Sequence, residues 1–568
     1  MQTWTHNYMP LGGSLGLSAL VASLPVFVLL FLIGVKHKPA WISALSGLGA
    51  AMLVALFVYG MPLGHMLNAT VYGAAFGLFP IGWIVYWAIV LYKVCEKTGK
   101  FEVIKDSIGG LTDDRRLQAL MIAFAFGAFI EGAAGFGTPV AVAAAMLTGL
   151  GFAPFYAAGI CLLANTAPVA FGSIGIPVVT LARITGLNEL QLSAWVGRIC
   201  APISIFVPAY LILVMGGPKA LMGVIPAVAV CGIAFATAQY FVSNFVGPQL
   251  TDILGALSAI LALVILLKVW KPADKFVLEG SHPMSIPKKH TTGEVILAWS
   301  PYLFLVFFVL LSGLSGNAII KGWFRGGAFE WFANLLDGVN TLLGKGTFRF
   351  DWPGLAGNII QVSPVTATPG PYPADQTSYQ LNLLTASGTA CFAASIASMF
   401  MLRLSPGKYV GILGDTAKSL SKSMLTIASV LGLAYLLNFC GATATMGLAF
   451  SATGVVFPFF SAMLGWLAVF LTGSDTSANA LFGNLQVVTA KTLNLDPTLM
   501  AAANSAGGVM GKMISLQSIA VAAAATGMAS SDESKLFRFT LRHSVFLASL
   551  LGIIVMLYSY VIVWPLPN

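Results

Sequence analysis

The stretch FLTGSDTSANALFG, residues 470–483, places Asp475 beside a glycine, hydroxyl residues and an asparagine, between long apolar segments. A carboxylate at the centre of a bilayer costs about 2.5–3.5 kcal/mol even on the insertion scales that give the lowest values. Acids inside membrane spans are therefore rare, and they mark paths for substrates or ions. The stretch predicts a membrane fold built around a polar interior site.

The composition is that of a polytopic membrane protein. The 568 residues are 58% hydrophobic and 9% charged, with a mean hydropathy of +0.87. A soluble domain carries about 25% charged residues, so no soluble core of this length could bury so much apolar surface. The net charge of +9 is explained by basic cytoplasmic loops and does not indicate a nucleic-acid partner.

Apolar runs of spanning length, about 20 residues, are followed by basic segments that orient them. The runs lie near 15–35, 40–60, 70–92, 195–215, 221–243, 250–268, 296–316, 381–402, 423–440 and 544–564. Alternation across the first spans puts the basic segments 36–39 and 93–116 on one side, which the positive-inside rule makes cytoplasmic. The segment 317–380, rich in glycine, proline and threonine, is then expected outside.

Two longer apolar stretches, 118–181 and 447–527, are interrupted by glycine, proline, asparagine and acids, and they share a weak repeat. CLLANTAPVAFG (161–172) and MAAANSAGGVMG (500–511) both read Ala-Asn-hydroxyl-Ala with a glycine at the same offset. An acid precedes each asparagine, by 34 residues in the first copy and 29 in the second. Matches this short also arise by chance in a chain rich in alanine and glycine.

The predicted topology gives the two copies opposite orientations. The first is entered from the basic loop that ends at Arg116, and the second follows the span 423–440, which runs from the basic segment 403–422 to the outside. Inverted repeats place a substrate site near the bilayer centre, and irregular backbone at that depth must line a cavity or be buried in protein. We therefore predict an all-α polytopic fold, that of an inverted-repeat secondary transporter with re-entrant or broken helical hairpins.

Glu131 and Asp475 are the candidate proton-coupling residues. Loss of hydration disfavours the charged form of a buried carboxyl group, so either acid could carry a proton with a substrate. The alternative is a structural acid that accepts hydrogen bonds from nearby hydroxyl or backbone groups. An acid within a span is functional by default, and the two acids hold corresponding positions in the proposed repeat.

The candidate substrate-binding residues lie beside the expected helix breaks. Neutral donors and exposed backbone N–H groups at an unwound stretch suit a carboxylate, and Pro168 and Gly507–Gly508 are expected to break their helices. Ordinary capping or packing by small residues is the alternative. Lys512 could meet an anionic substrate, neutralise Asp475, or extend to the membrane surface. The candidates are Asn165, Thr166, Ser474, Asn504, Ser505, Lys512 and Gln517.

Other functional classes find less support. The six cysteines are scattered without a CxxC pair, histidine is sparse, and no metal or disulfide spacing is present. No cluster of His, Asp or Cys stands at catalytic spacing, which argues against a membrane enzyme. A channel is a further alternative, but central acids and paired broken segments suit a site that closes on both sides.

The chain resembles the L-lactate permease family, the lactate and glycolate proton symporters of bacteria. The likeness runs through nearly the whole chain and includes WTHNYMPLGG, FGAFIEGAAGFGTPVAV, ANTAPVAFGSIGIP, LGWLAVFLTGSDTSANALFG, GGVMGKMISLQSIA and LFRFTLRHS. The resemblance implies a multi-pass carrier of the bacterial cytoplasmic membrane that brings in L-lactate, and also D-lactate and glycolate, with protons. We expect a substrate-bearing domain that moves as an elevator, no cofactor beyond the co-transported proton, contacts with membrane lipid, and the capacity to form a homodimer.

The coupling ion is the main alternative within this resemblance. ANT at 164–166 and ANS at 503–505 are similar to the Ser-Asn-Thr tips of carboxylate carriers in the wider ion-transporter superfamily. Because alanine replaces the first serine in both, the sodium coordination of those carriers is not transferred, and proton coupling fits better. A sodium-coupled carboxylate carrier stays open.

Six regions are expected along the chain. They are the first spans of repeat 1 (1–117), its hairpin and substrate region (118–182), scaffold spans with a cytoplasmic loop (183–295), the spans of repeat 2 with the outer segment 317–380 (296–446), the second hairpin and substrate region (447–530), and a C-terminal span (531–568).

Overall fold

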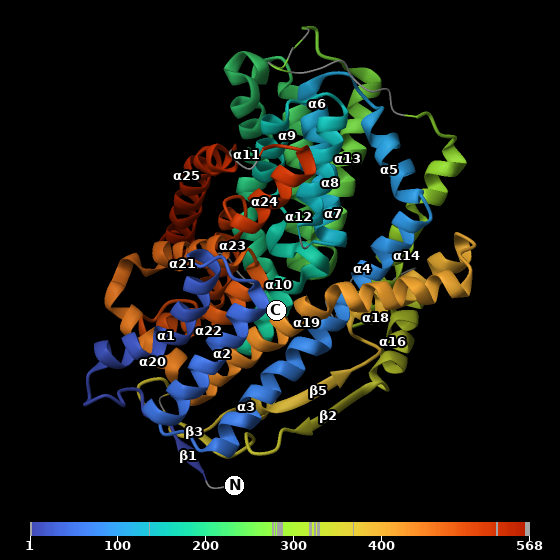
Figure 1. Cartoon of the computed structure of the whole chain (residues 1–568). Coiled ribbons are helices and arrows are strands. Elements are labelled where there is room, and N and C mark those ends of the chain that lie inside the picture. Colours follow the sequence, from blue (N-terminus) through green and yellow to red (C-terminus); the bar gives the residue numbers. More distant parts are fainter. Residues whose placement is uncertain are drawn as a thin grey trace.

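The computed structural model describes residues 3–135, 137–274, 276, 278, 280, 288–316, 321, 322, 325, 330–366, 368–529 and 532–562. Within these residues, twelve helices are long and apolar enough to cross a membrane, or up to thirteen if one bent pair counts as a span. Figure 1 shows them packed into a single helical body with short strands at one end. The predicted polytopic helical fold is confirmed.

The elements follow one another in three groups. The first is β1 (Trp4–Thr5), α1 (Leu15–Gly34), α2 (Ala40–Leu53), α3 (Leu63–Phe76), α4 (Trp83–Lys97), α5 (Lys100–Gly109), α6 (Arg115–Gln118), α7 (Gly127–Ala133), α8 (Thr138–Gly149), α9 (Pro154–Ala164) and α10 (Gly172–Thr185). The second is α11 (Glu189–Met222), α12 (Ile225–Phe245), α13 (Thr251–Val269), α14 (Thr292–Gly316), α16 (Glu330–Gly344), β2 (Thr347–Asp351), β3 (Ile359–Gln361), β4 (Gly370–Pro371), α17 (Ala374–Thr377) and β5 (Ser378–Asn382). The third is α18 (Ser387–Met401), α19 (Pro406–Cys440), α20 (Ala442–Phe450), α21 (Phe457–Thr472), α22 (Asp475–Thr492), α23 (Pro497–Lys512), α24 (Leu516–Thr526) and α25 (Glu533–Tyr560).

Helices from the two ends of the sequence form a common layer. In Figure 1 the blue helices α2 and α3 lie beside the orange helix α19. The backbones of α3 and α19 approach so closely that a Cβ on Gly73 would lie 2.4 Å from the carbonyl oxygen of Leu431. Glycine at this contact therefore sets the distance between the two helices.

The first interrupted stretch forms a hairpin and a broken helix. The first hairpin consists of the π-helical run Ala119–Phe126 with α7 and of α8, and its chain reverses between α7 and α8. The first broken helix consists of α9 and α10, joined across a bend of 64°. At the break Ser173 and Ile174 have φ angles of 49° and 61°, and such conformations cost about 1–3 kcal/mol each. The break predicted near Pro168 is confirmed.

The second interrupted stretch repeats this plan. The second hairpin consists of α21 and α22, which reverse at Gly473–Ser474, and the second broken helix consists of α23 and α24, separated by Met513–Ser515. The break predicted at Gly507–Gly508 is wrong, because α23 continues through both residues. A Cβ on Gly507 would lie 2.0 Å from the carbonyl oxygen of Ala462, so this glycine allows α23 to pack closely on α21.

The two hairpins enter from opposite ends of the molecule, and α11 connects those ends. Near the end of α11, the carbonyl oxygen of Ala220 accepts a hydrogen bond from Arg116 at the base of the first hairpin. Near its start, the indole N–H of Trp195 donates to Asp496, in the loop between α22 and α23. The inverted orientation is therefore present. We call the end that carries Arg116 the basic face and the end that carries Asp496 the opposite face.

The segment 317–380 adds short strands to a helical fold. Its strands and β1 form two small sheets, β1-β3-β4 and β2-β5, while residues 317–320, 323, 324, 326–329 and 367 lie outside the described residues. Strand β1 pairs in parallel with β3, with Trp4 opposite Ile359. The N-terminus and this segment therefore share one face, as the alternation of spans predicts.

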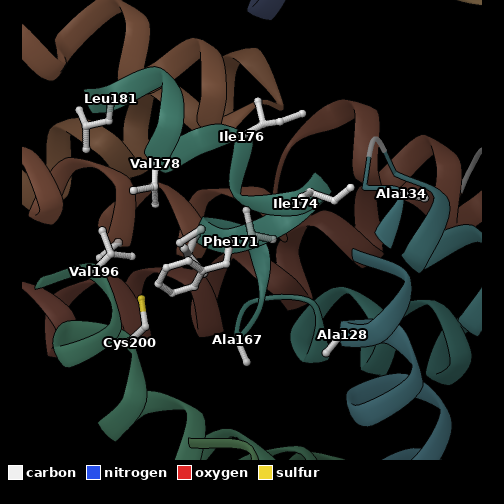
Figure 2. Close-up of a cluster of buried hydrophobic side chains, with 14 of the residues drawn as sticks. Ala128, Ala134, Ala167, Phe171, Ile174, Ile176, Val178, Leu181, Val196 and Cys200 are labelled. Carbon is white, nitrogen blue, oxygen red and sulfur yellow. The ribbon is translucent and has the colours of Figure 1, made fainter. Parts of the chain in front are cut away.

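Apolar side chains enclose the break in the first broken helix. Figure 2 shows Phe171 and Ile174 at the break, with Val196 and Cys200 of α11 on one side and Ala134 of the first hairpin on the other. All five side chains are buried. The irregular backbone is thus shielded from lipid, which is the condition for non-helical structure at membrane depth.

Candidate functional site

Both hairpin tips and both helix breaks meet at one small cavity. Its volume is about 80 Å³, and the share of one water molecule in liquid water is about 30 Å³, so the cavity has room for roughly three water-sized groups. Its polar lining comes from all four elements: Glu131, Ser173, Ser474, Asp475, Thr476, Lys512 and Gln517. The two acids, which belong to different halves of the sequence, therefore share one site sized for a small molecule.

Lys512 supplies the positive charge of the cavity. It is the last residue of α23, it is 8% exposed, and its ammonium group donates a hydrogen bond to the carbonyl oxygen of Gly473 at the second hairpin tip. The end of a helix favours a cation. The ammonium group lies close enough to Glu131 and Asp475 to interact with both.

Asp475 is held at the start of a helix by hydroxyl groups. It is the first residue of α22, and the N-cap Ser474 accepts a hydrogen bond from the backbone N–H of Ser477. Its Oδ2 accepts a hydrogen bond of 2.7 Å from Ser505, whereas its buried Oδ1 has no partner among the described residues. Asp475 is 4% exposed, so one oxygen is fixed and the other remains available for a ligand or a proton.

Glu131 has a drier setting on the first hairpin. It lies in the last turn of α7 and is 4% exposed. The start of α10 packs directly on it, since a Cβ on Gly172 would lie 2.5 Å from Oε1 of Glu131. Its Oε2 has no hydrogen-bond partner in the part of the chain that the structure describes. Asn165 lies close to the carboxyl group of Glu131, but its amide atoms have no hydrogen-bond partner among the described residues.

The two Asn-hydroxyl pairs do not occupy equivalent places. Asn165 is the C-cap of α9 and therefore lies at the break, whereas Asn504 lies inside α23, eight residues before its end at Lys512. The acids differ as well, because Glu131 is on the incoming arm of its hairpin and Asp475 begins the outgoing arm. The expectation of corresponding positions is wrong, although the hairpins themselves are inverted copies.

The paired residues form a layer behind the cavity rather than its wall. Thr166 donates a hydrogen bond to the carbonyl oxygen of Leu163, and Asn504 donates to Asn479 and accepts from Gln486. Asn479 also donates to Ser505, which in turn holds Asp475. This buried network positions the second tip from behind.

Ser474 and Gln517 line the cavity and also a neighbouring slot. The slot has a volume of about 140 Å³ and lies between the second tip and helices α1, α2 and α19. Its lining includes Ile33 and Ala40, which flank the basic loop 36–39. The slot therefore adjoins the cavity on the side of the layer next to that loop.

Asp252 was not among the predicted site residues. It lies in the first turn of α13, is 1% exposed, and neither of its carboxylate oxygens has a partner among the described residues. In the sequence it lies inside the apolar run 250–268, so the rule that selected Glu131, an acid within a span, would have found it.

Comparisons with known proteins place these features in context. The chain matches the family model described as L-lactate permease over residues 18–562. It is 45% identical over 577 residues to the L-lactate permease of Bacillus subtilis (strain 168), covering 99% of this chain and 100% of that protein. It is 43% identical over 575 residues to the glycolate permease GlcA of Escherichia coli (strain K12), covering 99% of each. It is 41% identical over 575 residues to the L-lactate permease of Salmonella typhimurium (strain LT2), covering 100% of each.

Proposed function

The chain belongs to the L-lactate permease family, and on this premise we propose that it takes up L-lactate, D-lactate and glycolate, with protons, across the bacterial cytoplasmic membrane. It is a multi-pass transport protein, and its substrates are small 2-hydroxymonocarboxylates. The relatives named for lactate and for glycolate support both substrates. The coupling to protons is inferred from the charged residues of the cavity.

One observation carries the proposal: a buried lysine faces two buried acids across a cavity the size of a small organic anion. Lys512 can bind the carboxylate of the substrate. The hydroxyl groups of Ser173, Ser474 and Thr476 can donate a hydrogen bond to its 2-hydroxyl group or accept one from it. A volume of about 80 Å³ suits lactate and glycolate better than larger dicarboxylates.

The charges of the site favour proton coupling. With Glu131, Asp475 and Lys512 all ionised, the cavity lining carries one excess negative charge, and a bound monocarboxylate would make it two. Leaving buried charges uncompensated costs several kcal/mol per ion. Protonation of Glu131 or Asp475 removes that cost, so the anion and the proton enter the buried state together.

The route of the substrate follows from the cavity and the slot. In this conformation the slot leads from Ser474 and Gln517 toward the loop 36–39, and access from the opposite face requires the tips to move relative to α1, α2 and α19. We propose an elevator movement of the hairpins and broken helices against that layer. We also propose that the protein forms a homodimer, which anchors the layer of α1, α2 and α19. Light scattering in detergent, which measures the mass of the particle, tests this.

Uptake in proteoliposomes tests the proposal. Wild-type protein should accumulate labelled L-lactate under an inward proton gradient in sodium-free buffer, and a protonophore should abolish the accumulation. Glu131→Gln and Asp475→Asn proteins should each lose gradient-driven accumulation. A requirement for sodium would favour the sodium-coupled alternative, and wild-type accumulation in both variants would remove the carboxylates from the mechanism.

A further inference from the structure

Among the described residues, Asp252 is a buried acid with both carboxylate oxygens unpaired, whereas Glu131 and Asp475 each have one unpaired oxygen. It is 1% exposed, neither carboxylate oxygen has a hydrogen-bond partner among the described residues, and it belongs to a helix that crosses the membrane. A carboxylate at such a position is expensive and marks a functional site by default. Structural acids in this fold look different, since Asp114 and Asp496 accept hydrogen bonds from helix N-termini.

The first hairpin packs directly against this acid. A Cβ on Gly132 would lie 2.8 Å from the Cβ of Asp252, so the glycine lets α13 approach α7 at the residue next to Glu131. Asp252 interacts electrostatically with Glu131 and lies near the thiol of Cys200 on α11. Within the described residues, no lysine or arginine forms an ion pair with it. Glu131 and Asp252 thus form a buried carboxyl pair with one member facing the cavity.

The other side of Asp252 leads toward the opposite face. It follows the short 3-10 turn Pro248–Leu250, and Gln249 in that turn donates a hydrogen bond of 2.7 Å to Glu189 at the start of α11. Glu189 lines a cavity of about 290 Å³, together with Arg183 and Gly186. The residues that line this outer cavity do not line the central cavity. Asp252 follows Gln249 by three residues in the chain and therefore lies on the side of Glu131 that is nearer the outer cavity.

We propose that Asp252 receives the co-transported proton from the outer cavity and passes it to Glu131, so that the two carboxyl groups form a proton site distinct from the substrate cavity. The proposal rests on the proposed function and deepens it. Two neighbouring carboxylates in an apolar site repel each other, so the pair retains at least one proton. No hydrogen bond joins the two carboxyl groups among the described residues, so the transfer requires a bridging water molecule or a rotation of one side chain. The transfer is balanced: the carboxyl group of Asp252 loses a proton, the carboxylate of Glu131 gains one, and Asp252 is reprotonated from the outer side.

Separating exchange from accumulation tests this role. A single proton carried with each monocarboxylate allows roughly tenfold accumulation for a gradient of about one pH unit. Asp252→Asn protein should lose this accumulation and the lactate-induced proton influx, read with an internal pH dye. Lactate counterflow at equal pH, which needs no net proton movement, should stay within about twofold of wild type.

Two further variants separate a proton role from a structural one. Thr251→Val changes the adjacent buried residue, whose hydroxyl donates to Gly247, without touching a carboxyl group, and it should accumulate lactate like wild type. Gly132→Ala keeps both carboxyl groups but forces them apart, and it should weaken accumulation more than counterflow. The double variant Glu131→Gln/Asp252→Asn should be no worse than either single variant, because the groups act in series.

The outcomes are distinct. Normal accumulation by Asp252→Asn, or a parallel loss of counterflow in both Asp252→Asn and Thr251→Val, would overturn the proton role while the proposed function stands. If wild-type protein moves no lactate in either assay, the proposed function itself is wrong.

Discussion

The two hairpin tips face one cavity but hold their acids in opposite electrostatic settings. Glu131 lies in the last turn of α7, where the helix dipole opposes a negative charge, and Asp475 opens α22, where the dipole favours one. Asp475 is also held by Ser505, whereas Glu131 stands next to the unpaired Asp252. Acids that look alike in the sequence therefore have different surroundings.

This difference in surroundings indicates that the two tips have different functions. The second tip, with an anion-favouring helix start and Lys512 close by, is suited to organise the bound anion. The first tip, with a carboxyl pair beneath it, is suited to hold the proton. Variants of the second tip should therefore change the affinity for the substrate, and variants of the first tip should change the coupling of substrate to proton.

The largest effect is expected from Lys512→Met, which removes the cation that both tips share. Deleting one partner of a buried charged set costs about 3–5 kcal/mol, which corresponds to a hundredfold loss of uptake or more. The matched control is Lys491→Met, at the exposed end of α22. Retained uptake in Lys512→Met would show that the cavity binds its anion without this lysine. Thermal unfolding in detergent checks that the variant is folded.

The second effect separates the two acids. Glu131→Gln should abolish accumulation driven by a pH gradient but keep counterflow, because the substrate side of the cavity is intact. Asp475→Asn should also raise the lactate KM in counterflow by about tenfold, since it disturbs the hydrogen bond from Ser505, and hydrogen bonds to charged groups contribute about 1.5–3 kcal/mol. If both variants showed the same accumulation ratio and the same lactate KM, the two tips would not have separate roles.

The third prediction uses the glycine that packs on each acid. A Cβ on Gly508 would lie 2.2 Å from Oδ1 of Asp475, and overpacking costs about 1–3 kcal/mol. Gly508→Ala should therefore raise the lactate KM by about tenfold, whereas Gly172→Ala, which presses on Glu131, should mainly lower the accumulation ratio. Gly49→Ala, in α2 with open space around it, is the matched control and should transport normally.

The smallest effect is expected behind the second tip. Asn479→Ala removes the donor to Ser505, the donor to the carbonyl oxygen of Pro177 and the acceptor for Asn504. It leaves the hydrogen bond from Ser505 to Asp475 in place. Of the three hydrogen bonds lost, the one to Ser505 leads to the cavity, and a net contribution of about 0.5–1.5 kcal/mol predicts a roughly two- to tenfold rise in the lactate KM with an unchanged accumulation ratio. A changed accumulation ratio would mean that this network also affects the proton.

The sequence predicts most of the architecture because hydrophobic runs and basic loops depend only on local composition. The inverted hairpins and the break near Pro168 follow from such signals, and the cytoplasmic side stays a prediction from the basic loops. The break in the second unit does not, because Gly507 and Gly508 are helical and their small size is needed by α21 and the second tip. A glycine that breaks a helix and a glycine that admits a neighbour look the same in a sequence.

The sequence also predicted only part of the candidate site correctly. Five candidates line the cavity as a group: Glu131, Asp475, Lys512, Ser474 and Gln517. Asn165 and Thr166 lie at the first break, and Asn504 and Ser505 lie inside α23, behind the second tip. Asp252 was missed because it opens an ordinary apolar run. Its proximity to Glu131 depends on how α13 packs against α7, which no spacing in the sequence records.

By itself, the sequence determined that this chain lies in a membrane and that its acids must be interior, since water-to-lipid transfer is a property of each residue and of its immediate run. Tertiary structure alone decided which acids meet, which end of a helix each one occupies, and which glycines permit the approach. Those features depend on distances between segments that lie tens to hundreds of residues apart in the sequence, and electrostatic energy in a low-dielectric interior is set by such distances.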